Sequence, residues 1–326
     1  MAAVIPADRT AWGLQLPIQS QSSAYVQPWE VDATSADLAA IVRAADRAGA
    51  FYVAVCDHVG IPRPADETMS AVWYDTVATL GWIAGFTESV HLLSHVYVLP
   101  YRHPMMVAKA FSTLDELSGG RAILGAGAGH LRSEFEMLGV DFEGRGRAVE
   151  ESLRLIRSAF TESHPVVDFA DSVGGADGAG GAPTHHEVAM APRPARAGGP
   201  PIWIGGSSPA AMRRAAQLAD GWLPQGPPEM GTRAAIEHIR NLRDEAGMPE
   251  AFDMGVNCEP LHLGARRDGM PEWTLAGSPD EVAARLRRYV DLGINQLQVR
   301  FVTDSAQEYC EQLERFGAEV APLLQP

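Results

Sequence analysis

Asp57 and His58 stand directly after the apolar run Phe51–Cys56, where an acid–base pair could form. A carboxylate can orient or charge an imidazole, and an imidazole transfers protons near neutral pH. Alternatively, Asp57 only caps the next turn, and backbone groups satisfy the hydrogen bonds of the His58 ring. His95 and His103, in the segment SHVYVLPYRHP, present the same two alternatives. These side chains are therefore candidates whose role depends on where the fold places them.

A second candidate is the segment IWIGGSSPAAMRRAA, which contains Gly205, Gly206, Ser207 and Ser208 before a proline. They begin a predicted helix, where free backbone N–H groups and the helix dipole favour a phosphate. An N-cap serine followed by proline needs no ligand and is the alternative. Phosphate sites of barrels usually follow the seventh and eighth strands, whereas this turn follows the fifth predicted strand. The anion site is therefore predicted from the local sequence alone.

The segment LSGGRAILGAGAGH places Gly125, Gly127 and Gly129 at alternate positions after a short apolar run. Alternate residues of a strand share one face, so this face carries no side chain. Glycine within a strand often marks the close approach of a ligand or of another backbone. The spacing is not that of a dinucleotide fingerprint, because His130 and Leu131 stand where the last glycine would be. We therefore expect a strand face without side chains. We do not expect a dinucleotide-binding turn of the Rossmann type.

The sequence predicts neither a metal site nor a disulfide. Cys56, Cys258 and Cys310 are far apart and odd in number, which fits a reduced cytoplasm. His185 and His186 are adjacent but have no nearby third ligand, so they do not define a metal site. We therefore assign no metal and expect a cytoplasmic protein.

Composition narrows the class of partner. The 326 residues are 46% hydrophobic and 21% charged, as in an ordinary globular protein. A net charge of -15 disfavours nucleic acid and anionic membranes as partners. The N-terminus has no basic segment followed by a long apolar one, and no stretch approaches 18 apolar residues. A small-molecule partner is expected.

The chain alternates helical and strand patterns. Three segments repeat one unit, in which an amphipathic helix ends at a glycine or turn and an apolar strand follows: IVRAADRAGAFYVAVCDH, MRRAAQLADGWLPQG and LRRYVDLGINQLQVR. Such alternation predicts an α/β protein with eight parallel strands closed into a (β/α)₈ barrel, one domain over residues 1–326. The predicted strands are Trp12–Leu16, Phe51–Cys56, Val90–Val98, Arg121–Ala126, Pro201–Ile204, Gly221–Leu223, Asp253–Pro260 and Asn295–Phe301.

Two further segments complete this prediction. A last helix is expected from Ser305 to Val320. The glycine-rich stretch Asp168–Gly199, before the fifth strand, is predicted to be an irregular and mobile loop, because so long a loop is usually a lid or an insertion. In such a barrel the catalytic groups gather at the C-terminal ends of the strands, where the candidates above stand.

Taken together, these segments resemble the bacterial luciferase-like monooxygenase superfamily, and within it the branch that uses the deazaflavin coenzyme F420. The resemblance is carried by DHVGIPRP, by Leu92–Phe160 and by PPIWIGGSSPAAMRRAAQLADGWLP. It implies a barrel with the cofactor across its C-terminal mouth. It also implies that Gly127 and Gly129 line the cofactor cleft, although close packing of a helix on the strand is the alternative.

The resemblance assigns further residues. Asp57 and His58 match the family's cofactor-contacting pair, and Gly205, Gly206 and Ser207 match its phosphate-binding turn. A non-prolyl cis peptide bond that supports the cofactor ring is expected at Ser94-His95. His58 is the first candidate for acid–base work and His130 is the second.

The implied activity is hydride transfer between F420 and an organic small molecule. His130 stands where F420-dependent glucose-6-phosphate dehydrogenases have a glutamate, and a single lysine, Lys109, cannot repeat their phosphate clamp, so glucose 6-phosphate is not expected. An FMN-dependent monooxygenase and a non-catalytic cofactor-binding barrel are the alternatives. Relatives are commonly dimers, so the resemblance also implies a homodimer.

Overall fold

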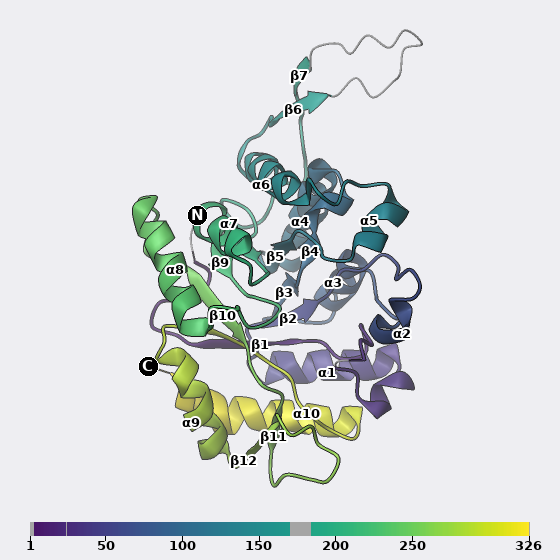
Figure 1. Cartoon of the computed structure of the whole chain (residues 1–326), viewed down its shortest axis with the longest axis vertical. Coiled ribbons are helices and arrows are strands. Elements are labelled where there is room, and N and C mark those ends of the chain that lie inside the picture. The colour runs from purple at the N-terminus through teal and green to yellow at the C-terminus, as the bar shows by residue number, and fades with distance from the viewer. Residues whose placement is uncertain (1–2, 24, 170–183, 326) are drawn as a thin grey trace.

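Eight parallel strands close into a barrel surrounded by helices in the computed structural model (Figure 1). The structure describes residues 3–23, 25–169 and 184–325. Pairing of β1 with β13 and of β3 with β5 completes the ring. All eight predicted strands are confirmed: β1 (Ala11–Gln15), β2 (Tyr52–Val55), β3 (His91–Ser94), β5 (Ala122–Gly127), β8 (Ile202–Ile204), β9 (Gly221–Trp222), β10 (Asp253–Asn257) and β13 (Gln296–Val299).

Helices follow the strands, as the sequence pattern predicts. Two of them begin with capping boxes, in which Thr34 and Ser278 exchange hydrogen bonds with the third helical residue. The expected last helix is α-helical as far as Arg315. From Phe316 to Val320, its predicted end, it continues as a π-helical turn. The main helices are α1 (Ser35–Arg47), α3 (Thr76–Ala84), α4 (Pro104–Ser118), α6 (Arg145–Thr161), α7 (Pro209–Leu218), α8 (Thr232–Glu245), α9 (Pro279–Val290) and α10 (Ala306–Arg315).

Two apolar clusters support the barrel. The larger one fills the space between the strands and the helices. The smaller one lies inside the barrel and includes Tyr52, Leu93, Ile123, Trp203 and Leu223, all at most 1% exposed. Successive strand residues point to opposite faces, so Tyr52 and Leu93 point inward while their neighbours pack against helices. Packed side chains therefore close the lower part of the barrel.

The third barrel strand is broken where the sequence predicts one run, Val90–Val98. β3 ends at Ser94 and a second segment, β4 (Tyr97–Val98), pairs with β5 after two intervening residues. The non-prolyl cis bond joins these two residues, at His95-Val96. The expected position, Ser94-His95, was wrong by one bond, because Ser94 still belongs to the ladder, paired with Val55.

The segment Asp168–Gly199 is not wholly irregular. β6 (Val166–Phe169) and β7 (Thr184–Glu187) form an antiparallel hairpin, so strand pairing extends into the stretch predicted as a loop (Figure 1). Residues 170–183 lie outside the described part of the chain, and the predicted mobility falls largely on them. None of the described helices is long and apolar enough to cross a membrane.

Candidate active site

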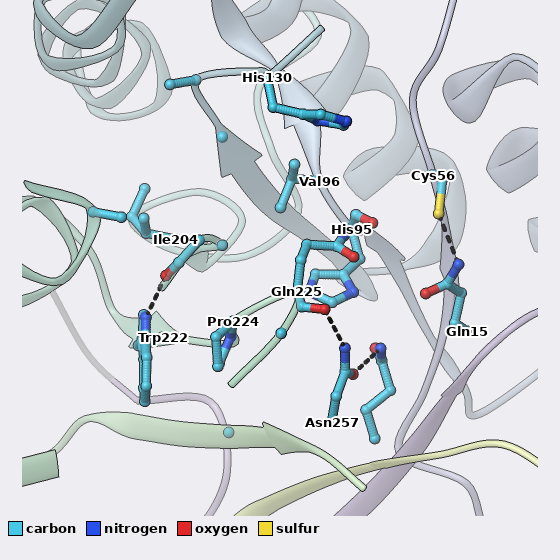
Figure 2. Close-up of a pocket in the computed structure, with 18 of the residues that line it drawn as sticks. Gln15, Cys56, His95, Val96, His130, Ile204, Trp222, Pro224, Gln225 and Asn257 are labelled. Atoms are coloured by element: carbon cyan, nitrogen blue, oxygen red, sulfur yellow. Dashed lines mark hydrogen bonds between the residues drawn. The ribbon is translucent and has the colours of Figure 1, made fainter. Parts of the chain in front are cut away.

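A cavity of about 1100 Å³ opens at the C-terminal ends of the strands (Figure 2). The known drug-sized pockets of proteins occupy roughly 300–1,000 Å³, so this cavity has room for more than one small ligand. Residues that follow β1, β2, the β3–β4 break, β5, β8, β9, β10 and β13 all contribute to its wall. Among the described residues 184–199, none lines it.

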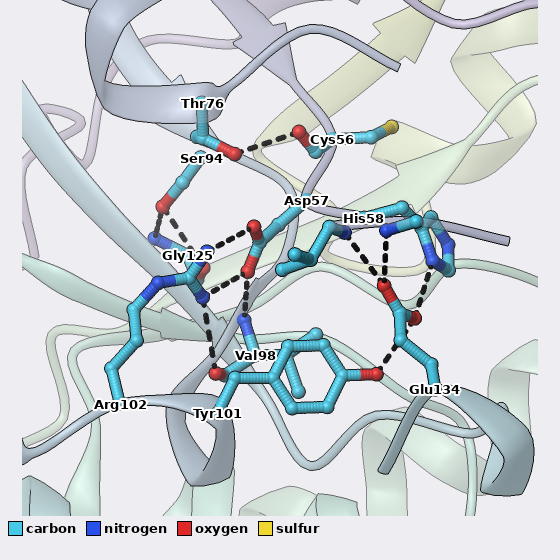
Figure 3. Close-up of polar contacts among 12 residues, drawn as sticks. Cys56, Asp57, His58, Thr76, Ser94, Val98, Tyr101, Arg102, Gly125 and Glu134 are labelled. Atoms are coloured by element: carbon cyan, nitrogen blue, oxygen red, sulfur yellow. Dashed lines mark hydrogen bonds and ion pairs between the residues drawn. The ribbon is translucent and has the colours of Figure 1, made fainter. Parts of the chain in front are cut away.

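His58 lines this cavity and is held by a buried carboxylate (Figure 3). Its Nδ1 lies 2.8 Å from Oε2 of Glu134, and the Glu134 side chain is fully buried. Glu134 also accepts hydrogen bonds from the Tyr101 hydroxyl, at 2.8 Å, and from the backbone N–H of Val59, at 2.6 Å. Although burial raises it, these hydrogen bonds keep the pKa of Glu134 below its usual value. The carboxylate is therefore charged at neutral pH.

The Glu134 contact determines which nitrogen of His58 can react. A charged carboxylate accepts only, so Nδ1 must carry a proton and donate it to this bond. The other nitrogen, Nε2, remains for exchange of a proton with a molecule in the cavity. This arrangement is that of a histidine oriented by a carboxylate for acid–base catalysis.

His130 stands beside His58. The two rings lie with centroids 5.8 Å apart and nearly perpendicular, and Trp73 lies on another side of His58 at 4.4 Å. Loss of solvent contact lowers the pKa of His130, and His58 adds to this effect, whereas Glu134 opposes it. His130 is therefore neutral near pH 7, with its ring at the edge of the same cavity.

Asp57 also reaches the cavity wall, but its carboxylate is fully engaged by the protein (Figure 3). Each carboxylate oxygen lies 2.7 Å from a different terminal nitrogen of Arg102, which is a bidentate ion pair. Oδ2 also accepts the backbone N–H of Val98 at 2.8 Å. Asp57 therefore connects the end of β2 to the segment after the β3–β4 break. Its contact with a cofactor, expected from the resemblance, stays a prediction.

The glycines of β5 make room for neighbouring side chains. A Cβ atom on Gly127 would lie 2.6 Å from the Val96 side chain, and one on Gly205 would lie 2.2 Å from it. Val96 is thus held between two bare backbones in the floor of the cavity. A Cβ on Gly129 would lie 2.8 Å from Phe135, which belongs to the short helix α5 (Arg132–Leu138). The helix-packing alternative therefore explains Gly129 in part, although Gly127 and Gly129 both line the cavity.

His95 is buried in the wall beside Val96 (Figure 2). Its Nε2 lies 3.0 Å from the carbonyl oxygen of Leu223, whereas Nδ1 is buried without a partner among the described residues. Burial lowers the pKa of His95 to about 4, which the Leu223 contact only partly offsets. His95 is therefore neutral, with Nε2 as the donor. The Gln225 side chain donates to the His95 carbonyl at 2.5 Å and fixes the break.

Two helix N-termini meet at one end of the cavity. Gly205, Gly206 and Ser208 line it where α7 begins, and Arg145 and Gly146 line it where α6 begins. The Ser208 hydroxyl caps α7 by accepting the N–H of Ala211, as the alternative reading predicted. Free N–H groups and the positive ends of two dipoles favour an anion here.

Arg145 adds a cation to this end of the cavity. Its guanidinium stacks on Phe142 at 3.7 Å and donates to the Phe142 carbonyl at 2.7 Å. In the described part of the chain no carboxylate pairs with it, whereas Arg214, which also lines the cavity, pairs with Glu150 at 3.2 Å. Arg145 is therefore available to a phosphate.

The structure brings most predicted site residues together. Asp57, His58, His95, Gly127, Gly129, His130, Gly205 and Gly206 all line the cavity. Ser94 does not; it is buried and bonded to the Gly125 backbone. Ser207 lies in the turn, but Ser208 lines the cavity in its place. No group of three or more metal-ligating side chains occurs in the described residues.

Sequence reasoning missed Glu134, Arg145 and Trp73. Glu134 lies four residues after His130 on α5, so it could have been suspected as an acidic residue following the glycine ladder. Arg145 is one of several arginines in FEGRGRAVEESLR, and its spacing does not distinguish it. Trp73 lies in a loop with no regular pattern.

The closed parallel barrel and the cavity at its C-terminal mouth define a ligand-binding (β/α)₈ barrel of the kind that carries its active site there. More narrowly, the chain belongs to the luciferase-like monooxygenase family, whose sequence profile matches residues 12–268.

Relatives in this family differ in activity. The chain is 26% identical to the F420-dependent glucose-6-phosphate dehydrogenase of Kineococcus radiotolerans, over 86% of this chain and 91% of that protein. It is 36% identical to the 4-hydroxyprotoasukamycin monooxygenase of Streptomyces nodosus, over 59% of this chain and 55% of that protein. The F420-dependent tetrahydromethanopterin reductase of Methanopyrus kandleri shares the fold, with a TM-score of 0.69 and 20% identity over 97% of this chain and 100% of that one.

Proposed function

We propose that this protein is an F420-dependent oxidoreductase that moves a hydride between the deazaflavin cofactor and an organic small molecule. The observation that carries the proposal is that His58, oriented by the buried Glu134, lines the same cavity as Arg145 and the N-termini of α6 and α7. Relatives of similar length named as F420-dependent support it, and the monooxygenases among the relatives keep FMN as the alternative cofactor.

The residues present fit a cofactor with a flat ring and a phosphate tail. Arg145 and the N-termini of α6 and α7 would hold the phosphate at one end of the cavity. Val96, held between two glycine backbones, gives the floor a small apolar surface on which a ring can rest.

When bound, F420 supplies a carbon that gives or accepts a hydride, and the protein supplies position, a dry pocket and a proton. Glu134 fixes the His58 ring and its tautomer, with the Nδ1 proton in the bond to the carboxylate. His58 Nε2 then gives a proton to the substrate in one direction or removes it in the other. His130 is the second candidate for this proton transfer.

Titration of the purified protein with F420, followed by absorbance, tests the proposal. A dissociation constant well below that of an unrelated barrel, together with turnover of reduced F420 on a panel of carbonyl compounds, is the expected result. Binding no tighter than that of the unrelated barrel contradicts it. Tight F420 binding without any turnover would favour the non-catalytic barrel.

A parallel titration with FMN decides between the two cofactors. Reduced flavin reacts with dioxygen, whereas deazaflavin resists that reaction. Oxygen uptake with reduced FMN and yellow protein on purification would therefore identify an FMN-dependent monooxygenase. We expect neither.

We also propose that the protein acts in the cytoplasm, as its three scattered cysteines indicate, and that it is a homodimer, as the resemblance implies. Light scattering on the purified protein gives its mass in solution, and a mass of one chain contradicts the dimer.

A further inference from the structure

The side of the cavity opposite the anion site is aromatic. In the barrel, β1 lies across from β8, the strand that leads to the anion site. Tyr25 follows β1 and Trp73 follows β2. Trp273 lies between β11 (Leu261–Leu263) and β12 (Leu275–Gly277), and Leu261 of β11 pairs with Phe301, just after β13. All three aromatic residues line the cavity. Tyr25 is 48% exposed and Trp273 is 53% exposed. Large exposed aromatic side chains that share one cavity mark a ligand site.

Trp73 is fixed beside His58. Its indole lies 4.4 Å from the His58 ring, its Nε1 donates to the Ser70 carbonyl at 3.0 Å, and its backbone bridges to Ser20. The indole N–H is therefore used by the protein. What Trp73 offers a ligand next to the reactive histidine is its apolar ring.

Arg300 and Glu259, two charged residues on this side of the cavity, both have ion-pair partners. Arg300 lines it, but its guanidinium lies 2.8 Å from Oε1 of Glu30 and 2.9 Å from the Tyr25 carbonyl. Glu30 is fully buried, and its other oxygen accepts the N–H of Ile18 at 2.9 Å. Glu259 is likewise paired, with Arg285 at 3.1 Å. A ligand carboxylate on this side would have to share the Arg300 guanidinium with the buried Glu30, and an incompletely paired buried charge is costly.

Building on the proposed function, we infer that the substrate is an uncharged molecule in which an aromatic or conjugated ring adjoins the reacting carbonyl or enone. The ring packs against the Trp73 side of the cavity and the reacting atoms lie near His58. In the reducing direction, the electrophilic carbon would take the hydride that reduced F420 supplies when bound. The atom that receives the electron pair takes a proton from Nε2 of protonated His58, so the substrate gains two hydrogens and the cofactor is oxidised.

Two matched probes test the inference. Benzylideneacetone is an uncharged aromatic enone, and its para-carboxylate analogue has the same frame with one negative charge. Binding of each to the F420-loaded protein is measured by quenching of tryptophan fluorescence. We expect benzylideneacetone to bind at least about 10-fold more tightly, the scale of an unpaired carboxylate in a protein site. Equal or tighter binding of the carboxylate overturns the inference.

Variants identify which residues of the cavity cause the preference for the uncharged probe. Trp73→Leu keeps an apolar side chain but removes the ring, and should weaken benzylideneacetone binding about 3- to 10-fold, the scale of an aromatic pair. Trp82→Leu, on the exposed face of α3 and outside the cavity, should leave it unchanged. Glu30→Gln frees Arg300 and should narrow or reverse the preference. An unchanged affinity in Trp73→Leu contradicts the inference even if Glu30→Gln fails to fold.

The failure of this inference can be told from the failure of the proposed function. If F420 binds tightly but the probes show no preference for the uncharged ring, only the substrate class is wrong. If F420 does not bind and the apoprotein still prefers benzylideneacetone, the aromatic site stands and the cofactor assignment is wrong.

Discussion

Glu134 and His58 are 76 residues apart in the chain, and their side chains meet at 2.8 Å. In Glu134→Gln the amide can donate to Nδ1, which places the proton on Nε2 and so gives His58 the wrong tautomer for accepting a proton there. We expect kcat to fall at least about 10-fold with little change in F420 affinity, because the histidine loses the carboxylate that sets its tautomer.

Tyr101→Phe is the matched control for this prediction, since it removes one hydrogen bond to Glu134 but leaves the carboxylate. Its kcat should stay within about 3-fold of the wild type. His58→Ala should cost at least about 100-fold, as general acid–base catalysis does. A Glu134→Gln enzyme with normal kcat would show that the carboxylate only supports the fold.

The Val96 side chain fills the space above Gly205, so an alanine at position 205 should overpack the floor of the cavity. Gly205→Ala should lower the free energy of unfolding by about 1 to 3 kcal/mol, because its Cβ would lie 2.2 Å from Val96 Cγ1. Val96→Ala in the same chain should restore much of this loss. Gly226→Ala, with no atom within 4 Å of its added Cβ, is the control. Denaturant unfolding is measured for these three variants and for Val96→Ala alone, and additive effects at positions 96 and 205 would refute the contact.

Asp57 is predicted to hold the fold at the end of β2 through its bidentate contact with Arg102. Asp57→Asn should lower the free energy of unfolding by about 3 kcal/mol, because it leaves a largely buried guanidinium unpaired. Glu319→Gln breaks an exposed pair with Arg315 and should change stability by less than about 1 kcal/mol. If Asp57→Asn keeps its stability and loses F420 affinity instead, the cofactor role expected from the sequence is the correct one.

Arg145 should anchor the phosphate of the cofactor. Arg145→Gln is expected to weaken F420 binding about 10-fold, the scale of one hydrogen bond to a charged group. Binding of the deazaflavin core without phosphate should be unaffected. Arg147→Gln, on the same helix but outside the cavity and paired with Glu151, should change neither. An equal loss of affinity for F420 and for the phosphate-free core would mean that Arg145 only supports the structure of α6.

His95 should make the protein less stable in acid. Its pKa is lowered to about 4 from 6.5, so between these values the unfolded chain binds a proton that the folded protein does not. Stability is then lost as the pH falls, by about 2 kcal/mol between about pH 7 and about pH 4.5. His95→Gln keeps a donor for the Leu223 carbonyl and should remove this part of the pH dependence. Denaturation at both pH values checks it, with the exposed His164→Gln expected to behave as the wild type.

The barrel could be predicted from the sequence because each strand and helix is encoded locally. Apolar runs such as Phe51–Cys56 and capping signals such as Ser278 act within a few residues, and both appear in the structure. The break at His95-Val96 could not be located to the residue, because it depends on how β3 and β5 pair rather than on the local sequence.

The candidate site was predictable only where residues stand at strand ends. His58 and Gly205 follow strands, so the barrel itself brings them to one mouth. Glu134 and Arg145 come from helices between strands, and their contacts depend on tertiary packing that no spacing in the sequence reports. The alternate glycines predict a strand face without side chains, but the space that this face leaves at Gly127 is filled by Val96.

The packed cluster around Tyr52 and Trp203 has a kinetic consequence, since it leaves the described barrel with no passage through its base. Whatever enters from the mouth must also leave by it. If the proposed cofactor lies at the floor, a substrate bound above it would cover its way out, so cofactor and substrate would share one route of exchange.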